Sequence, residues 1–221
     1  PIEMIVRDYM TGSTNTSIWS MYREGARKMY GITFPDGLVK NQKLSKTILT
    51  PTTKATQGEH DQPITPAAIV KQGLLTQERW DELAQVSLDI FARGRELSAK
   101  RGLILVDTKF EFGLDENGNV CLADEILTPD SSRYWLQESY AKRMAAKENP
   151  KGLDKEFLRL WVNEHCDPYK DVIPEIPEDT LVEFAGRYIQ LFENVTGQEF
   201  VTDVPSTTIL ERIRTNLIKY F

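Results

Sequence analysis

The chain has 221 residues, of which 40% are hydrophobic and 27% charged, and its formal net charge is −6. This composition is typical of a globular protein with a core of its own, and no apolar run reaches the roughly 20 residues that span a bilayer. The negative charge argues against general nucleic-acid binding. Two cysteines exclude a disulfide scaffold, so we expect a cytoplasmic protein. From its charge and its lack of a long apolar run, we expect neither nucleic acid nor membrane as a partner.

The chain opens on PIEMIVRDYM, in which Ile2, Met4 and Val6 occupy alternate positions. This alternation predicts a strand that is already under way at the first residue. Because a domain rarely starts in mid-strand without a partner hairpin, we interpret the chain as the C-terminal part of a longer protein. A short helix over residues 17–24 follows, and residues 31–66 are predicted to be rich in loops.

The later part of the chain is dominated by predicted helices. Thr65 and Pro66 form an N-cap and N1 pair, and Gly73 ends the short helix that they begin. The clearest helix covers residues 76–101, where the residues expected on one face are Trp80, Leu83, Ser87, Ile90, Phe91 and Leu97. Further helices are predicted from Asp154, over 178–195 and over 208–219. This order of strands and helices predicts a mixed α and β domain.

The stretch LVDTKFEFGLDENGNVCLADEILTPDSSRYW places charged residues along a predicted strand of a hairpin. Asp107, Lys109 and Glu111 share one face of this strand because successive side chains point to opposite faces. DENGN predicts the turn. A four-residue loop, 116–119, places Glu111 opposite Asp124, whereas a three-residue loop turns Asp124 to the other face.

Two interpretations of these charges remain open at this point. The first is that they form the solvated face of a half-exposed hairpin, which is common in antiparallel sheets. The second is that Glu111 and Asp124 hold a hard divalent cation between them. Magnesium suits the second interpretation because it takes one or two carboxylates together with nucleotide phosphates. A calcium loop at DENGN is excluded, since its glycine stands at the wrong position and no bidentate glutamate follows.

Candidate anion-binding residues lie on either side of the hairpin in the sequence. Arg7 precedes TGS, where a backbone turn and the hydroxyl of Ser13 can hold a phosphate. TPDSSR sets Asp130, Ser132 and Arg133 in a tight turn after the hairpin. Taken alone, Arg133 is equally well interpreted as a surface arginine.

The segment KATQGEHD contributes Lys54, His60 and Asp61 to a long polar loop, which in a compact domain is usually functional or disordered. We interpret His60 as a local hydrogen-bonding residue. His165 and Cys166 are adjacent near a helix end and are interpreted as structural, because zinc needs more ligands than this chain gathers.

Three segments together carry a family resemblance: PIEMIVRDYMTGS, DTKFEFG and ADEILTPDSSRYW resemble the SAICAR synthetase family. The loop TPTTKATQGEHD looks like the longer version found in that family. The resemblance is dense over residues 1–135 and continues more loosely through the following helices. It implies an α+β fold of the SAICAR synthase type, in which an antiparallel sheet carries the site and helices pack on it.

The resemblance also implies an activity. The family consists of ATP-dependent carbon–nitrogen ligases of de novo purine biosynthesis, which join carboxyaminoimidazole ribonucleotide (CAIR) and L-aspartate to give SAICAR, ADP and phosphate. The implied mechanism activates the CAIR carboxylate as an acyl phosphate, which the aspartate amine attacks. Such chemistry uses Mg²⁺ to neutralise and align phosphates, and fixed positive charges to hold anionic substrates.

The site residues implied by the resemblance fall into three groups. The catalytic group near the reacting carboxylate and the imidazole contains Lys109, Asp61 and Asp107. The group that binds the ribonucleotide substrate contains Arg7, Ser13, Asp130, Ser132 and Arg133. The group that binds ATP contains Lys54, Glu111 and Asp124, of which Glu111 and Asp124 are also the expected magnesium ligands.

The family begins with a small β-rich domain whose glycine-rich hairpin covers the ATP phosphates. We therefore expect residues 1–200 to be the C-terminal substrate- and Mg-binding domain, which alone binds ATP poorly and is inactive. Residues 201–221 are expected to be an added helix for packing or for contact in a homo-oligomer. Two alternatives stay open: a non-catalytic anion-binding or interaction domain derived from a ligase, and a kinase-like phosphotransferase.

Overall fold

The computed structural model describes residues 1–54, 61–168, 170–201 and 206–220. Its centre is an antiparallel sheet built on two adjacent strands, β1 (Ile2–Tyr9) and β6 (Leu103–Leu114). Two strands pair with the free edge of β1 and two with the free edge of β6. These strands are β4 (Lys43–Leu49) and β5 (Thr52–Thr53) on β1, and β7 (Val120–Ala123) and β8 (Ser132–Leu136) on β6.

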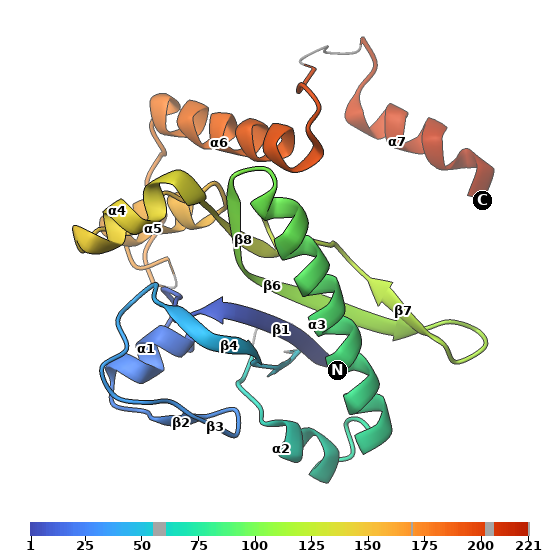
Figure 1. Ribbon diagram of the computed structural model, residues 1–221. Helices are drawn as coiled ribbons and strands as arrows, with labels where there is room; N and C mark the ends of the chain where they lie inside the picture. The colour runs from blue at the N-terminus through green and yellow to red at the C-terminus, as the bar shows by residue number, and fades with distance from the viewer. Residues whose placement is uncertain (55–60, 169, 202–205, 221) are drawn as a thin grey trace.

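Helices surround this sheet, and the longest of them, α3, crosses one face of it (Figure 1). A separate small hairpin, β2 (Lys28–Met29) and β3 (Ile32–Thr33), packs with the first helix. The helices are α1 (Ile18–Arg23), α2 (Pro66–Lys71), α3 (Gln77–Ala99), α4 (Gln137–Ala145), α5 (Glu156–His165), α6 (Glu178–Thr196) and α7 (Ile209–Leu217), and the turn η1 (Ile218–Tyr220) follows α7. Within the described ranges, no helix combines the length and the apolar character needed to cross a bilayer.

The main core lies between α3 and the sheet. Met4 and Val6 of β1, Phe91 of α3, and Leu105 and Phe110 of β6 are all completely buried there. Full burial of such side chains contributes about 1.5–3 kcal/mol each. The hydrophobic contact between α3 and the two central strands therefore fixes the back of the sheet and leaves its other face for polar residues.

A β-bulge explains how a core strand comes to carry acids. Leu105 pairs with Tyr134 of β8, but Asp107 pairs with the next residue, Arg133, so Val106 is an extra residue in β6. Leu105 before the bulge faces the core, and the extra residue turns Asp107 to the opposite face. The bulge thus changes which face the odd-numbered residues occupy.

A close helix contact on the core side depends on Gly94 of α3. A Cβ atom there would lie 2.6 Å from Cδ1 of Leu127 and 3.1 Å from Cδ2 of Leu105. Such separations are shorter than ordinary van der Waals contact, so the absence of a side chain allows α3 to approach β6 and the loop after β7.

The predicted fold class, the first strand and the first helices are confirmed. Thr65 Oγ1 accepts a hydrogen bond from the backbone N–H of Ala68 (3.1 Å), and Thr76 Oγ1 accepts one from that of Arg79 (3.1 Å), so both act as N-caps. Gly73 has a left-handed backbone (φ 70°) after the short helix, as the stop signal requires.

Two local predictions are wrong, and a third is partly confirmed. The loop-rich stretch 31–66 contains β4. The turn predicted at TPDSSR is present, since the backbone N–H of Ser132 donates to the carbonyl of Thr128 (3.0 Å), but Ser132 and Arg133 already belong to β8. Both strands are short segments that are stabilised by pairing with β1 or β6, which local sequence does not reveal. Leu97, expected on the buried face of α3, is 46% exposed, and Ser98 is buried in its place.

The prediction that a four-residue loop places Glu111 opposite Asp124 is also wrong. Glu111 pairs with Ala123, and hydrogen bonds across the turn close a loop of three residues. The carboxylate of Asp115 accepts hydrogen bonds from backbone N–H groups inside this turn, and Gly118 supplies its left-handed residue (φ 80°). The turn chemistry, and not cross-strand charge, therefore sets the register.

Candidate active site

Asp107 is the centre of a buried charge cluster on the polar face of the sheet. Its Oδ2 accepts hydrogen bonds from Nη1 of Arg7 and from Nη1 of Arg133, the latter at 2.6 Å. Arg7 and Arg133 stand opposite Asp107 on the two strands that flank β6. Cross-strand neighbours on one face of a sheet are close enough to interact directly, so the register of three strands assembles this group.

The two guanidinium groups of this cluster are held in fixed orientations. Arg7 also donates from Nε to Thr50 Oγ1 at 2.8 Å. The side chains of Arg7, Asp107 and Arg133 are 11%, 5% and 17% exposed. Burial would lower the pKa of Arg133, but the charge of Asp107 first and then that of Glu156 raise it above its ordinary value. Both arginines are therefore charged and oriented before any ligand arrives.

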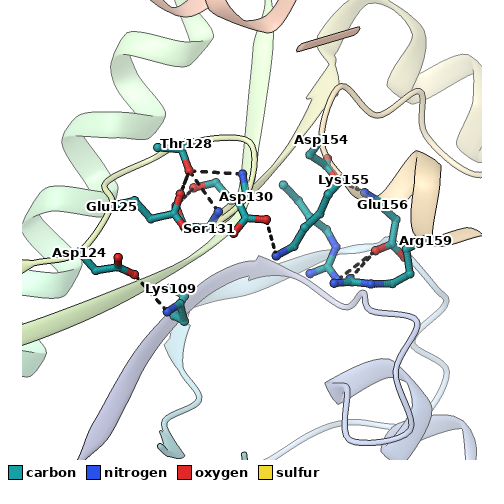
Figure 2. A network of polar contacts seen from close by, with 12 residues as sticks. Lys109, Asp124, Glu125, Thr128, Asp130, Ser131, Asp154, Lys155, Glu156 and Arg159 are labelled. Atoms are coloured by element: carbon teal, nitrogen blue, oxygen red, sulfur yellow. Dashed lines mark hydrogen bonds and ion pairs between the residues drawn. The ribbon is translucent and has the colours of Figure 1, made fainter. Parts of the chain in front are cut away.

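The first turn of α5 adds a second layer of charge. Arg159 donates from Nη1 to Glu156 Oε2 at 2.9 Å, and Arg133 Nη2 lies 3.5 Å from the same oxygen (Figure 2). Burial alone would raise the pKa of Glu156, but Arg133, the Ser13 hydroxyl and Arg159 together outweigh it and hold the pKa below its usual value. Glu156 is thus an ionised carboxylate among arginines.

Asp154 anchors this turn to the sheet. Its Oδ2 accepts a hydrogen bond from the backbone N–H of Tyr134 (3.0 Å), and its Oδ1 accepts one from that of Glu156 (2.9 Å). Burial raises the pKa of Asp154 from 3.8 to about 6, against the attraction of Arg133. A buried carboxyl group therefore fixes the start of α5 relative to β8.

These elements enclose a pocket of about 170 Å³. Its wall includes Arg7, Lys109, Ser132, Arg133, Glu156 and Arg159. Two buried donors at this place, the hydroxyl of Ser13 and Nε of Arg133, have no hydrogen-bond partner within the described part of the chain. Buried donors without partners are costly, so their presence beside a cationic pocket indicates a site for an anionic ligand.

The loop between β7 and β8 forms one side of the pocket, and Thr128 shapes it (Figure 2). Thr128 Oγ1 donates to the carboxylate of Glu125 and accepts from the backbone N–H groups of Asp130 and Ser131, each at 3.3 Å. Lys155 donates to Asp130 Oδ1 at 2.9 Å, and this bond lowers the pKa of Asp130. The loop is therefore tied both to itself and to the start of α5.

A second charge cluster surrounds Lys109 beside the pocket. The Lys109 Nζ atom lies 2.5 Å from Glu111 Oε1, 3.2 Å from Glu3 Oε1 and 3.6 Å from Asp124 Oδ2. Lys54 bonds to the other oxygen of Glu111. The pKa of Glu111 is lowered, by Lys109 first and then by Lys54. Burial would lower the pKa of Lys109, but Glu111 and Glu3 raise it well above its ordinary value.

The side chain of Asp124 reaches this cluster in spite of the unexpected register. Strand β7 ends at Ala123, and Asp124 has a left-handed backbone (φ 62°). This conformation releases the side chain from the alternation of the strand and lets it approach Lys109. The predicted proximity of Asp124 to Lys109 and Glu111 is therefore found, although the predicted cross-strand pairing is not.

Magnesium fits the chemistry of this cluster. Glu111 and Asp124 offer hard carboxylate oxygens that contact the same ammonium group, so both face one region. No group of three or more metal-binding side chains occurs among residues 1–54, 61–168, 170–201 and 206–220. A donor set of two carboxylates suits an ion whose remaining ligands are water and phosphate oxygens.

The structure brings together most of the residues predicted to form the site. The pocket wall contains Arg7, Asp107, Lys109, Asp130, Ser132 and Arg133. Lys54, Glu111 and Asp124 form the adjoining lysine cluster, and the buried hydroxyl of Ser13 lies near Glu156. Asp61 is exposed and is not among the residues that line the pocket. His60 lies outside the described residues.

Several site residues were not predicted, among them Glu3, Thr50, Asp154, Glu156 and Arg159. Glu3 carried a usable signal, because it is a charged residue in a strand whose neighbours are apolar. The residues of α5 follow the resembling segments, and their charges have the spacing of an ordinary solvated helix. Only the packing of α5 beside β8 shows that they reach the pocket.

Comparison with known proteins shows the family of the chain. A model of the SAICAR synthetase family matches residues 1–176. The chain belongs to the SAICAR synthetase family. A putative phosphoribosylaminoimidazole-succinocarboxamide synthase 2 of Agrobacterium fabrum is 52% identical over the whole chain, and so is the phosphoribosylaminoimidazole-succinocarboxamide synthase of Legionella pneumophila strain Paris. The chain covers 70% of the length of each.

A solved structure supports the family assignment. The Saccharomyces cerevisiae SAICAR-synthase, solved in complex with SAICAR, is 33% identical with a TM-score of 0.72. The match covers 90% of this chain and 61% of the yeast chain. The match thus spans somewhat less than two thirds of the yeast chain. Family members join CAIR and aspartate in purine biosynthesis, using ATP.

Proposed function

We propose that this chain carries the substrate- and metal-binding part of a ligase that joins CAIR and L-aspartate, with ATP cleaved to ADP and phosphate. Residues 1–200 form this part in the proposal, and residues 201–221 are an added helical segment. The carrying observation is the arginine pocket around Asp107, at which two buried donors have no hydrogen-bond partner among the described residues, directly beside the lysine and carboxylate cluster.

The pocket supports binding of the ribonucleotide phosphate. Arg7 and Arg133 present oriented guanidinium donors, and the Ser13 hydroxyl adds a neutral donor. Planar guanidinium groups match the oxygens of a phosphate, and donors fixed by Asp107 need little reorganisation when the ligand binds. The phosphate is thereby held at one end of the site, with the imidazole carboxylate directed toward Lys109.

Lys109 acts as a fixed positive charge in this proposal. Its raised pKa keeps the ammonium protonated, so it can donate hydrogen bonds to a carboxylate but cannot serve as a general base near neutral pH. Its place between the pocket and Glu111 suits contact with the carboxylate that is activated. A positive charge there stabilises the negative charge that develops during acyl transfer.

Mg²⁺, when bound with ATP, would neutralise the phosphate oxygens and align them for transfer. Glu111 and Asp124 would hold the ion. Both oxygens of Glu111 accept bonds from lysines in this structure, so Lys54 or Lys109 must release one of them. The carboxylate of Glu3 remains with Lys109 in that exchange and keeps its ammonium in place.

Turnover of CAIR, L-aspartate and Mg–ATP by the intact protein tests the proposal. Glu111→Gln and Asp124→Asn are each expected to reduce SAICAR formation at least about 100-fold, the order of loss seen when a group that stabilises transition-state charge is removed. Glu116→Gln, an exposed substitution in the turn of the same hairpin, is the matched control and should keep full activity. Wild-type turnover and Mg–ATP affinity in both site variants would refute the metal assignment.

A further inference from the structure

The position of Glu156 within the pocket is unusual for a carboxylate in an anion site. Its Oε2 accepts a hydrogen bond from Arg159 at 2.9 Å and lies 3.5 Å from Nη2 of Arg133. The Ser13 hydroxyl lies on the same side of this carboxylate. Glu156 thus takes contacts from cationic donors that an anionic ligand would also use.

The two acids that contact Arg133 differ in how freely they can move. Asp107 projects from the centre of the sheet, is 5% exposed, and bonds to two arginines. Glu156 has a longer side chain at the open end of a helix, and it is 20% exposed. When the Glu156 side chain rotates away, Arg133 stays paired with Asp107. The buried charge of Arg133 therefore keeps a counter-ion.

The donors without partners show what Glu156 does not satisfy. Nε of Arg133 is buried and has no hydrogen-bond acceptor in the ranges that the structure describes, and the buried Ser13 hydroxyl lies near the Glu156 carboxylate without a hydrogen bond of ordinary geometry to it or to another described group. The Glu156 carboxylate has two oxygens and is tied to α5, whereas a phosphate group offers three free oxygens in a tetrahedral arrangement. A phosphate can therefore satisfy these donors together with the Arg133 Nη2 and Arg159 groups that Glu156 occupies.

We propose that Glu156 is an internal competitor that sets the affinity of the pocket for phosphate-bearing ligands. Its carboxylate holds the arginines in the absence of ligand and is displaced when a phosphate enters. An internal competitor lowers the apparent affinity by the fraction of molecules in which the pocket is open. This inference rests on the proposed function, since it takes the pocket to be the one that receives the ribonucleotide phosphate.

Titration calorimetry with ribose 5-phosphate at low ionic strength tests the inference. Glu156→Gln is expected to bind the probe about tenfold more tightly than wild type, because binding no longer breaks a charge-assisted hydrogen bond. Glu156→Asp keeps the charge but withdraws the carboxylate by one methylene, so it should also bind more tightly, by a smaller factor. Glu164→Gln, an exposed acid on the same helix, is the matched control and should match wild type.

Each result decides between competition and other roles. Weaker binding by Glu156→Gln would show that Glu156 orients the arginines for the ligand, and would overturn the inference. An equal affinity in Glu156→Asp and wild type, with tighter binding in Glu156→Gln, would show a general effect of net charge and would overturn it too. If neither the wild type nor any variant binds ribose 5-phosphate, the pocket is not an anion site, and the inference is overturned. SAICAR formation by the wild type, measured separately, reports on the proposed function, so its failure is distinguishable.

Discussion

Two neighbouring charge clusters on one sheet use different cations in different surroundings. The cluster around Asp107 consists of buried arginines, whereas Lys54 and Asp124 of the other cluster have side chains that are 56% and 52% exposed. Arginine offers a rigid fork that recognises phosphate geometry, and lysine offers a compact charge on a flexible stem. The difference fits the proposed function, in which a fixed arginine site receives the substrate phosphate beside an adjustable site where lysines exchange carboxylates for other anions.

Among the substitutions that test this difference between the clusters, the largest loss of stability is expected at Asp107. Asp107→Ala leaves two buried guanidinium groups without their shared counter-ion, which should lower the free energy of unfolding by about 3–5 kcal/mol. Urea denaturation measures this change. Asp89→Ala on the exposed face of α3 is the control and should change stability by less than about 0.5 kcal/mol. A similar small loss in Asp107→Ala would contradict the fixed arginine site.

A smaller effect, confined to one pH window, is expected at Asp154 under the arginine pocket. Its folded-state pKa of about 6 exceeds the ordinary value of 3.8, so the folded state binds the proton more tightly. The resulting stability is present below about pH 4 and is lost as the pH rises through 6. Relative to Asp154→Asn, the wild type should lose on the order of 2–3 kcal/mol between pH 4 and pH 7.

Unfolding of both Asp154 proteins in urea at several pH values in this window measures the difference. The asparagine variant does not titrate at this position, so carboxyl groups elsewhere affect both proteins alike and cancel in the comparison. A stability difference that stays constant from pH 4 to pH 7 would show that burial does not raise the pKa of Asp154.

The smallest effect is expected in the lysine cluster. Lys54→Met removes an exposed partner of Glu111, while Lys109 still neutralises that carboxylate. The free energy of unfolding should hardly change, since exposed ion pairs contribute little to stability. Thermal or urea unfolding checks this value. A loss comparable to that of Asp107→Ala would remove the distinction between a fixed and an adjustable cluster.

The sequence predicted those parts of the fold that local signals determine. The capped helix that begins at Thr65 and the alternating strand that opens the chain carry their signals within a few residues. Strands β4 and β8 carry no such local signal, because each depends on pairing with a strand that is distant in the sequence. The hairpin register failed for a related reason, since the hydrogen bonds of the Asp115 side chain determine the loop length.

The candidate site divides in the same way. Asp107, Lys109 and Glu111 were identifiable because charged residues alternate along one strand, and Arg133 because it belongs to a segment that resembles the family. The role proposed for Glu156 was not identifiable from the sequence, since an acid at the start of a helix is ordinary. Its contact with Arg133 joins residues that are 23 positions apart. Contacts of this kind become visible only in three dimensions.

Gly94 links the back of the sheet to its front. The side chain of Leu127 packs against this glycine, and the carbonyl of Leu127 accepts a hydrogen bond from the Tyr134 hydroxyl at 2.7 Å. Leu127 belongs to the same loop that places Asp130 at the pocket wall. A methyl group at residue 94 would therefore displace Leu127 and, through the loop, would shift Asp130 at the pocket wall. Substitutions on α3, which contributes no residue to the pocket wall, can in this way change the shape of the pocket.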